Sequence, residues 1–209
     1  MAAQVRRAPP QVRRPDFNQS LIHLTKERKE APATGNADQT PRVVEAFEVL
    51  KEILTAGVIR GSDRTGYIKG PRTAACFTEV PLSAVHHIAS EPGTELRKYR
   101  YYGIALSKRA VFAAGGRPVI YVPDEEGGWI PDDEKWRQVR FEAEAEDWRV
   151  NWTHEREWRV PGQLDLGNVP ELHVLVWSTA EAEEIRALDG PVSGRIASIL
   201  PMQKLIQIL

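Results

Sequence analysis

The stretch THEREWRVPG, residues 153–162, decides how this chain is interpreted. We expect a β-strand over residues 155–160. Because side chains alternate along a strand, Glu155, Glu157 and Arg159 would then share one face. A carboxylate on a rigid strand is well placed to stabilise a developing positive charge, and a neighbouring carboxylate could accept a proton. The stretch therefore suggests acid–base or electrostatic chemistry, which His23 on another expected strand directs toward a nucleotide cofactor.

Length and composition are those of one globular domain. The chain has 209 residues, of which 42% are hydrophobic and 27% charged, and its formal net charge is −1. We expect a single domain over residues 19–209. Residues 1–18, rich in Arg and Pro, are interpreted as a flexible basic tail, or alternatively as an arm that touches phosphate.

The compartment follows from what the sequence lacks. One cysteine, Cys76, leaves no intramolecular disulfide and no cysteine-rich zinc site. No apolar run approaches the roughly 20 residues that span a bilayer, and no signal-peptide pattern opens the sequence. We expect a cytoplasmic protein that makes no membrane contact.

Strands and helices are expected to alternate without a Gly-rich nucleotide fingerprint, which favours an α+β fold with a mixed sheet over a doubly wound parallel one. Strands are expected at residues 20–25, 73–78, 101–106, 118–122, 155–160, 172–177 and 196–200. Helices are expected from the Thr40 cap to Gly57, through Val85 and Ile88, from the Ser107 cap to Gly115, over 132–148, and after the Ser178 cap with Glu181 three residues on. Loops are expected at residues 26–39 and 61–72.

A series of short motifs over residues 20–162 resembles the ADP-ribosyltransferase superfamily, in particular its branch of DarT-type DNA-modifying toxins and AbiGi-like abortive-infection proteins. In order, the motifs are Leu21-Ile-His-Leu-Thr25, Gly57 after a helix, Cys76-Phe-Thr-Glu-Val-Pro-Leu82, Tyr102-Gly-Ile-Ala-Leu106, Pro118-Val-Ile-Tyr-Val122 and Arg156-Glu-Trp-Arg-Val-Pro161. The resemblance implies split mixed β-sheets around a cleft that holds NAD as co-substrate.

The same resemblance implies roles for individual residues. Glu157 matches the late catalytic glutamate, which would stabilise the oxocarbenium-like state formed as the nicotinamide–ribose bond breaks. His23 matches the early histidine that hydrogen-bonds the adenosine ribose, and Thr25 would support the same end of NAD. Further cofactor contacts are expected from the neighbouring motif residues Leu24, Phe77 and Thr78. No metal is implied.

Each candidate has a structural alternative. Glu157 could be a solvated strand charge, and His23 a hydrogen-bonded histidine within a strand. Glu155 could be a general base toward the acceptor, although a surface charge is favoured. Arg72 is the candidate to pair with the NAD diphosphate or a nucleic-acid phosphate, with Arg60 and Arg64 as rivals in the same loop.

Three other constellations are weaker. A thiol–imidazole pair of Cys76 with His86 or His87 lacks a third orienting group, and His86, His87 and His154 have no zinc-ligand spacing. The tryptophans could stack on unpaired bases, although core packing is favoured. They are Trp129, Trp136, Trp148, Trp152 and Trp158, and they are interleaved with Arg137, Arg140, Arg149 and Arg156.

These observations lead to an expected function. It is a bacterial toxin or phage-defence enzyme that transfers ADP-ribose from NAD to a macromolecule, with nucleic acid, DNA or RNA, the favoured target. The alternative is a non-catalytic antitoxin or binding partner of a cognate toxin. A nuclease that uses the arginine and tryptophan cluster is a third hypothesis.

Overall fold

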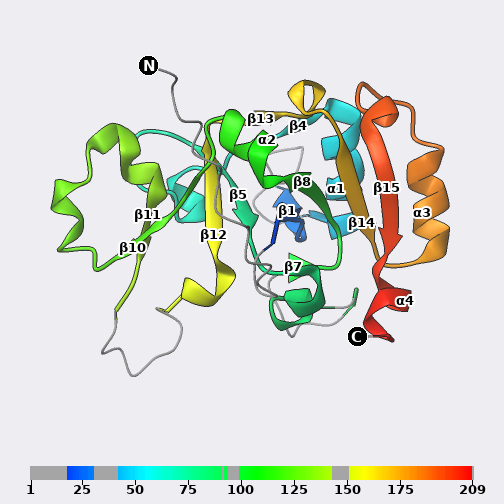
Figure 1. Ribbon diagram of the computed structural model, residues 1–209, viewed down its shortest axis with the longest axis horizontal. Helices are drawn as coiled ribbons and strands as arrows, with labels where there is room; N and C mark the ends of the chain where they lie inside the picture. The colour runs from blue at the N-terminus through cyan, green and yellow to red at the C-terminus, as the bar shows by residue number, and fades with distance from the viewer. Residues whose placement is uncertain (1–17, 31–41, 91, 94–98, 143–150, 209) are drawn as a thin grey trace, which may run out of the picture.

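The computed structural model describes residues 18–30, 42–90, 92–93, 99–142 and 151–208 (Figure 1). The strands are β1 (Ser20–Leu24), β2 (Arg28–Glu30), β3 (Arg42–Val44), β4 (Val58–Ile59), β5 (Ala74–Thr78), β6 (Ala89–Ser90), β7 (Tyr99–Arg100), β8 (Gly103–Ser107), β9 (Arg117–Pro118), β10 (Ile120–Val122), β11 (Gln138–Arg140), β12 (Glu157–Pro161), β13 (Leu164–Asp165), β14 (Leu172–Val176) and β15 (Ile196–Pro201). The α-helices are α1 (Ala46–Ala56), α2 (Lys108–Ala113), α3 (Thr179–Arg186) and α4 (Met202–Ile206). The 3-10 turns are η1 (Arg64–Gly66), η2 (Leu82–His87), η3 (Gly127–Trp129), η4 (Asp132–Arg137), η6 (Thr153–Glu155), η7 (Leu166–Asn168) and η8 (Ser193–Arg195).

A seven-stranded mixed sheet in the order β15-β14-β8-β1-β5-β12-β9 organises the molecule. Only β14 and β15 run parallel, joined by the α3 crossover, and the other neighbours are antiparallel. Figure 1 shows α3 and β15 at one end of this sheet and the lobe that carries β10 and β11 at the other. The expected α+β class with a mixed sheet is confirmed.

The sheet consists of two blocks that meet at one residue pair. β1 pairs with β8 over five positions, and β5 pairs with β12 over five positions. Between β1 and β5 the register holds only Ile22 opposite Thr78. Strands β15, β14, β8 and β1 therefore form one half-sheet, strands β5, β12 and β9 form the other, and β1 leaves β5 immediately after Ile22.

Each face of the sheet carries its own core. Helices α1, α2 and α3 pack on one face, where Leu21, Phe77 and Ile104 belong to a cluster that includes Leu50 of α1. The opposite face carries two smaller clusters. One joins Ile22, Leu24, Val85 and Met202, and the other joins Ile68, Ala74 and Trp136 with Cys76 packed against it. Alternation along the strands explains the division, because neighbouring residues such as Leu21 and Ile22 enter different clusters.

Several expected elements differ from the structure. The helix expected from Thr40 starts only at Ala46, because residues 42–44 form β3, which pairs with β2 inside the expected loop 26–39. The long helix expected over 132–148 is absent from the described part, where η4 leads directly into β11. The strand expected at 118–122 divides between β9 and β10, which join different sheets. Residues 1–17, 31–41 and 143–150, with the tail, the Thr40 cap and Trp148, lie outside the described residues.

The expected caps at Ser107, Ser178 and Gly57 are confirmed, whereas α1 begins after Glu45 and not after Thr40. The Ser107 hydroxyl accepts a hydrogen bond from the Ala110 amide at the start of α2, and Ser178 and Glu181 form a full capping box on α3. Gly57 ends α1 in the left-handed conformation, φ 68°. Within the described ranges, no helix combines the length and apolar character needed to cross a bilayer.

Candidate active site

A backbone kink places Glu157 at the first position of β12. Residues Thr153–Glu155 form a 3-10 turn, and Arg156 adopts a left-handed conformation with φ 46°. The Thr78 hydroxyl donates to the Glu155 carbonyl at 2.5 Å and fixes this turn. The strand starts at Glu157, so the prediction that Glu155 shares its strand face is wrong. The left-handed residue breaks the alternation on which the prediction depended.

A buried ion pair orients the Glu157 carboxylate. Arg159 Nε donates to Glu157 Oε1 at 2.8 Å, and Nη2 donates to Oε2 at 3.3 Å. The two side chains are only 4% and 12% exposed. The remaining nitrogen, Nη1, donates to the carbonyls of Trp136 (2.7 Å) and Gln138 (3.3 Å). Burial opposes the charge of Arg159, but the nearby Glu157 carboxylate raises the pKa of its guanidinium above the ordinary value.

Two tyrosines lie close to this ion pair. The Tyr121 hydroxyl accepts from the Glu157 amide at 3.1 Å and donates to the Trp152 carbonyl at 3.2 Å. Burial, together with the charges of Glu157 and Glu155, raises the pKa of Tyr121 to about 12. Burial, followed by the charges of Glu155, Cys76 and Glu157, raises the pKa of Tyr99 well above its ordinary value. Both hydroxyls therefore keep their protons at neutral pH and can donate hydrogen bonds.

His23 lies at the junction of the two half-sheets. Its Nδ1 is 2.8 Å from the Cys76 carbonyl oxygen. In a regular ladder Leu24 would pair with Cys76 two residues beyond the Ile22 pair, so the His23 ring takes the place of a strand–strand hydrogen bond. Burial lowers the pKa of His23, and the hydrogen bond only partly opposes this. Because a carbonyl can only accept, Nδ1 carries the proton of the neutral ring and Nε2 is an acceptor.

His23 and Glu157 are presented to opposite faces of the sheet. In the register, Thr78 of β5 lies opposite both Ile22 and Glu157, which places these three on one face. His23, the next residue along β1, packs instead against Phe77 with ring centroids 5.7 Å apart. The arrangement expected from the sequence, with the imidazole and the carboxylate facing each other across one cleft, is not the arrangement in the structure.

The side chains of the other residues expected to bind the cofactor make contacts within the protein. The Thr25 hydroxyl is buried and donates to the carbonyls of Ala46 (2.9 Å) and Tyr102 (3.3 Å). Leu24 and Phe77 are core residues on opposite faces. The Thr78 hydroxyl is used by Glu155 and by the Val80 amide. These contacts are structural, and none of them depends on a ligand.

The other charged and aromatic candidates, Arg72, the histidines and the tryptophans, do not form one cluster with Glu157. Arg72 is exposed, with its guanidinium 4.0 Å from the Asp133 carboxylate. The rings of His86 and His87 have centroids 4.0 Å apart and are tilted by 42°. No group of three or more His, Cys, Asp or Glu side chains among the described residues could hold a metal ion. Trp136 is buried, as expected for core packing, whereas Trp129 is 67% exposed.

Arg159 was expected on the same strand face as Glu157, and the structure confirms this, but the ion pair between them was not predicted. Tyr99 and Tyr121 were not predicted to lie near Glu157, because their approach depends on how distant segments fold together. With Cys76, which also hydrogen-bonds the Arg159 side chain, they complete the Glu157 surroundings.

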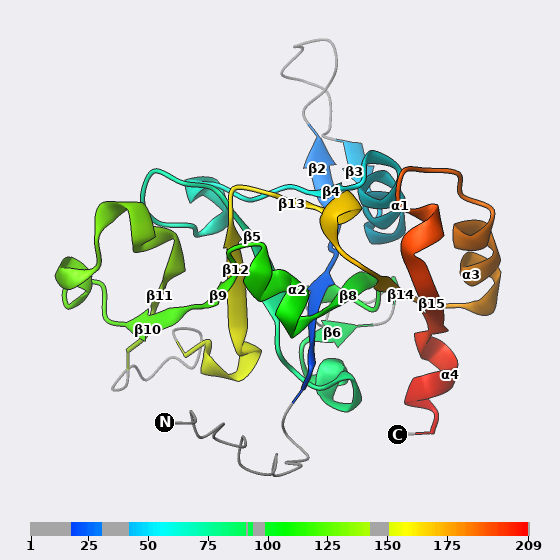
Figure 2. The same cartoon turned by 45° about the horizontal axis from the view of Figure 1, so that its top comes forward.

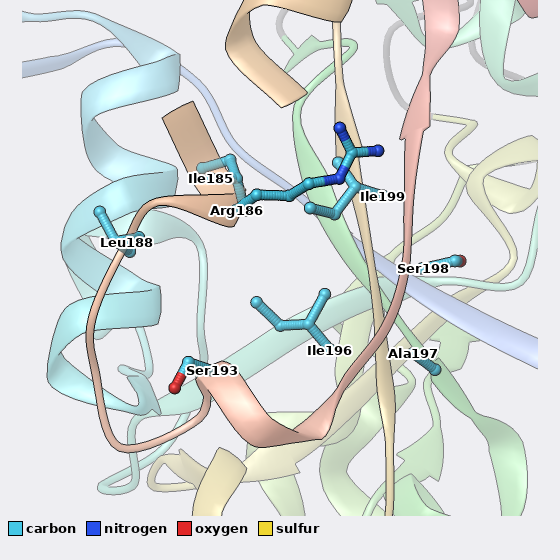
Figure 3. A pocket seen from close by; sticks show the side chains of 8 residues that line it. All are labelled: Ile185, Arg186, Leu188, Ser193, Ile196, Ala197, Ser198 and Ile199. Atoms are coloured by element: carbon cyan, nitrogen blue, oxygen red, sulfur yellow. The ribbon is translucent and has the colours of Figure 1, made fainter. Parts of the chain in front are cut away.

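A cavity lies at the other end of the sheet. It has a volume of about 410 Å³ and is lined by Ile185 and Arg186 of α3, by Ile196, Ser198 and Ile199 of β15, and by Leu188 in the connection between them (Figure 3). None of the residues singled out in the sequence lines it. The lining belongs to the β14–α3–β15 crossover.

Comparison with protein-family models, with curated proteins and with solved structures finds no match to this chain. Function is therefore argued from the site itself.

Proposed function

We propose that this protein transfers ADP-ribose from NAD to a macromolecular acceptor, with nucleic acid as the acceptor class and Glu157 as the catalytic carboxylate. The observation that carries the proposal is the nearly buried Glu157 carboxylate, held in one orientation by Arg159 beside the protonated Tyr121 and Tyr99 hydroxyls. Preorganised charge of this kind is the usual source of transition-state stabilisation.

The chemistry requires little else from the protein. The bond between ribose C1′ and the nicotinamide nitrogen breaks, and its electron pair leaves with nicotinamide. The ribose carbon becomes cationic and bonds to a nitrogen or oxygen of the acceptor, which then loses a proton. A fixed carboxylate next to the cationic carbon lowers the barrier electrostatically.

The sheet supports the same proposal. Two half-sheets joined at the single pair Ile22–Thr78 are compatible with the split sheets that the resemblance implies. In this proposal His23 has a different role from the one expected from the sequence. Its ring holds β1 and β5 together through the Cys76 carbonyl.

The test is transfer of label from NAD to a panel of DNA, RNA and proteins. Wild type should label at least one acceptor, and Glu157→Gln, which keeps the shape and removes the charge, should reduce labelling by at least about 100-fold. Glu183→Gln is the control, because the Glu183 carboxylate is exposed in its ion pair with Arg186. Equal labelling by wild type and Glu157→Gln would refute the assignment.

A non-catalytic partner role, as an antitoxin or binding protein, is the second candidate. The specific observation in its favour is that Arg159 already satisfies the Glu157 carboxylate, as in a purely structural ion pair. Expression in a host separates the two. Toxicity that disappears in Glu157→Gln supports the enzyme, whereas harmless expression with a stable protein complex supports the partner.

A further inference from the structure

Tyr67 combines an unfavourable backbone with an exposed ring. It is 83% exposed and has φ 68°, a left-handed conformation that disfavours bulky residues. Among the described residues only Tyr67 and Arg156 have a positive φ without being glycine, and Arg156 directly precedes Glu157. Unfavourable backbone conformations of this kind are concentrated at functional positions.

The turn that presents Tyr67 is held by hydrogen bonds among its own residues; we refer to residues 63–70 as the Tyr67 turn. The Asp63 carboxylate accepts from the amide and the hydroxyl of Thr65, at 2.9 and 2.6 Å. The Ile68 amide donates to the Asp63 carbonyl at 3.2 Å, and Arg64 Nε donates to the Gly70 carbonyl at 3.0 Å. The exposure of the ring is therefore a consequence of a defined local structure.

The Tyr67 turn is anchored on the same face of the sheet as Glu157. Ile68 is buried against Trp136 and Ala74, with Cys76 at the edge of the cluster. The Trp136 carbonyl in turn accepts from Arg159, which holds Glu157. Figure 2 shows the segment between β5 and the lobe that carries β10 and β11. A macromolecule bound over Glu157 could therefore reach the Tyr67 ring.

The charges around the ring select the class of partner. Residues 60–72 contain four cationic residues and one acidic residue. Lys69 is paired with Asp124, and the guanidinium of Arg72 lies 4.0 Å from the Asp133 carboxylate. Arg60, Arg64 and Arg72 are exposed. An exposed aromatic ring among arginines suits an unpaired base with its phosphates, because the base stacks and the guanidinium groups bind the backbone.

We propose that the Tyr67 turn is the surface on which the acceptor binds, with an unpaired base stacked on Tyr67 and phosphates contacted by Arg60, Arg64 and Arg72. The inference rests on the proposed function for its acceptor class. It adds a recognition residue outside the reacting groups.

The test measures binding without NAD. A labelled single strand of about 20 nucleotides, longer than the footprint of a single-strand module, is titrated by fluorescence anisotropy. Tyr67→Gly removes the ring and accepts the left-handed backbone, so it should fold and bind about 5- to 150-fold more weakly, as expected for one lost base–aromatic stack. Tyr67→Phe should bind like wild type, and Phe112→Ala, which removes another exposed aromatic ring, is the control.

Salt dependence gives a second readout. Arg60→Ala, outside the Tyr67 turn, should lower the slope of log affinity against log salt by about 0.7, because one phosphate contact is lost. Binding of Tyr67→Gly within twofold of wild type, equal affinity for duplex and single strand, or no binding by wild type would each overturn the inference.

Nicotinamide release from NAD, measured on the same proteins without acceptor, separates the two proposals. If nicotinamide release depends on Glu157 but nucleic-acid binding is unchanged in Tyr67→Gly, the proposed function stands and the Tyr67 turn is not the acceptor surface. If nucleic-acid binding depends on Tyr67 but the protein neither releases nicotinamide nor transfers label, the Tyr67 turn stands as a binding surface and the proposed function is wrong.

Discussion

At the scale of single residues, Arg159 is the group on which the Glu157 site depends. It neutralises a nearly buried carboxylate and donates to two backbone carbonyls, of Trp136 and Gln138. Removal of one partner of such a pair leaves the other charge uncompensated. We expect Arg159→Met to lower the free energy of unfolding by about 3–5 kcal/mol, measured by urea denaturation.

The chain offers a matched control in Arg186, whose ion pair with Glu183 is exposed. Arg186→Met should change stability by no more than about 0.5 kcal/mol, because solvent screens exposed pairs. The double variant Glu157→Gln with Arg159→Met should recover part of the loss, since no unpaired charge remains. A loss below about 1 kcal/mol for Arg159→Met would show that water reaches this ion pair.

His23 should make stability depend on pH. Its pKa is lower in the folded protein than the ordinary value of 6.5, so the unfolded chain binds the proton more readily. The stabilisation is therefore complete above pH 6.5 and is lost as the pH falls toward the folded-state pKa, by at most about 1.4 kcal/mol per pH unit. His23→Asn can still donate to the Cys76 carbonyl but does not titrate.

The measurement is urea unfolding at several values between about pH 7.5 and pH 5.5, the range in which an ordinary histidine titrates. The decline in stability should be smaller in His23→Asn than in wild type. The same change at the exposed His154 should leave the wild-type decline intact. Parallel pH profiles for wild type and His23→Asn would contradict a buried neutral ring at the junction.

The sequence predicted which residues share a strand face better than it predicted which residues contact each other between strands. The Glu-x-Arg spacing contains the Glu157–Arg159 pair, because strand alternation alone brings the side chains together. The roles of Thr25 and Phe77 were not accessible, because their contacts come from α1 and the neighbouring strands. The prediction that His23 and Glu157 face each other across one cleft was wrong for a similar reason. The sheet face on which each side chain lies depends on the register between strands, and the sequence of a single strand does not contain that register.

At the scale of elements, α1 shows how a terminal residue limits a helix. Gly57 donates its amide to the Ile53 carbonyl at 2.8 Å with φ 68°, and a Cβ added there would lie 3.0 Å from Pro191 Cγ. Gly57→Ala should therefore cost about 1–2 kcal/mol in thermal or urea unfolding. Gly194→Ala is the control, because nothing lies within 4 Å of its added Cβ. Equal stabilities for the two variants would contradict a strained cap.

Elements with strong local signals were predicted, and those defined by tertiary contacts were not. The Ser178–Glu181 capping box and the apolar β14 follow from adjacent residues. The charged stretch after Asp132 has the composition of a surface helix, but Trp136 is drawn into the cluster with Ile68, and β11 then pairs with β10. Burial of that one aromatic side chain and the strand pairing outweigh helix propensity.

At the scale of the whole molecule, the two half-sheets are joined by one backbone pair, Ile22–Thr78, whereas the strand pairings within each half-sheet are longer. Side chains from both halves, among them Leu21 and Phe77, pack in one core cluster across the junction. A ligand that touches both halves would add contacts across this junction. Its binding would therefore appear as stabilisation of the entire fold.

NAD should raise the melting temperature if the proposed function is correct. A ligand at about 100 times its dissociation constant adds about 2.7 kcal/mol, which for a chain of this length corresponds to roughly 5–10 °C. The measurement is a thermal shift over a series of NAD concentrations, with ADP-ribose as the control that lacks nicotinamide. Glu157→Gln should keep most of the shift, because the carboxylate acts on the developing cation more than on bound NAD. No shift at millimolar NAD would mean that the co-substrate does not bind, and Glu157 would then be a structural partner of Arg159.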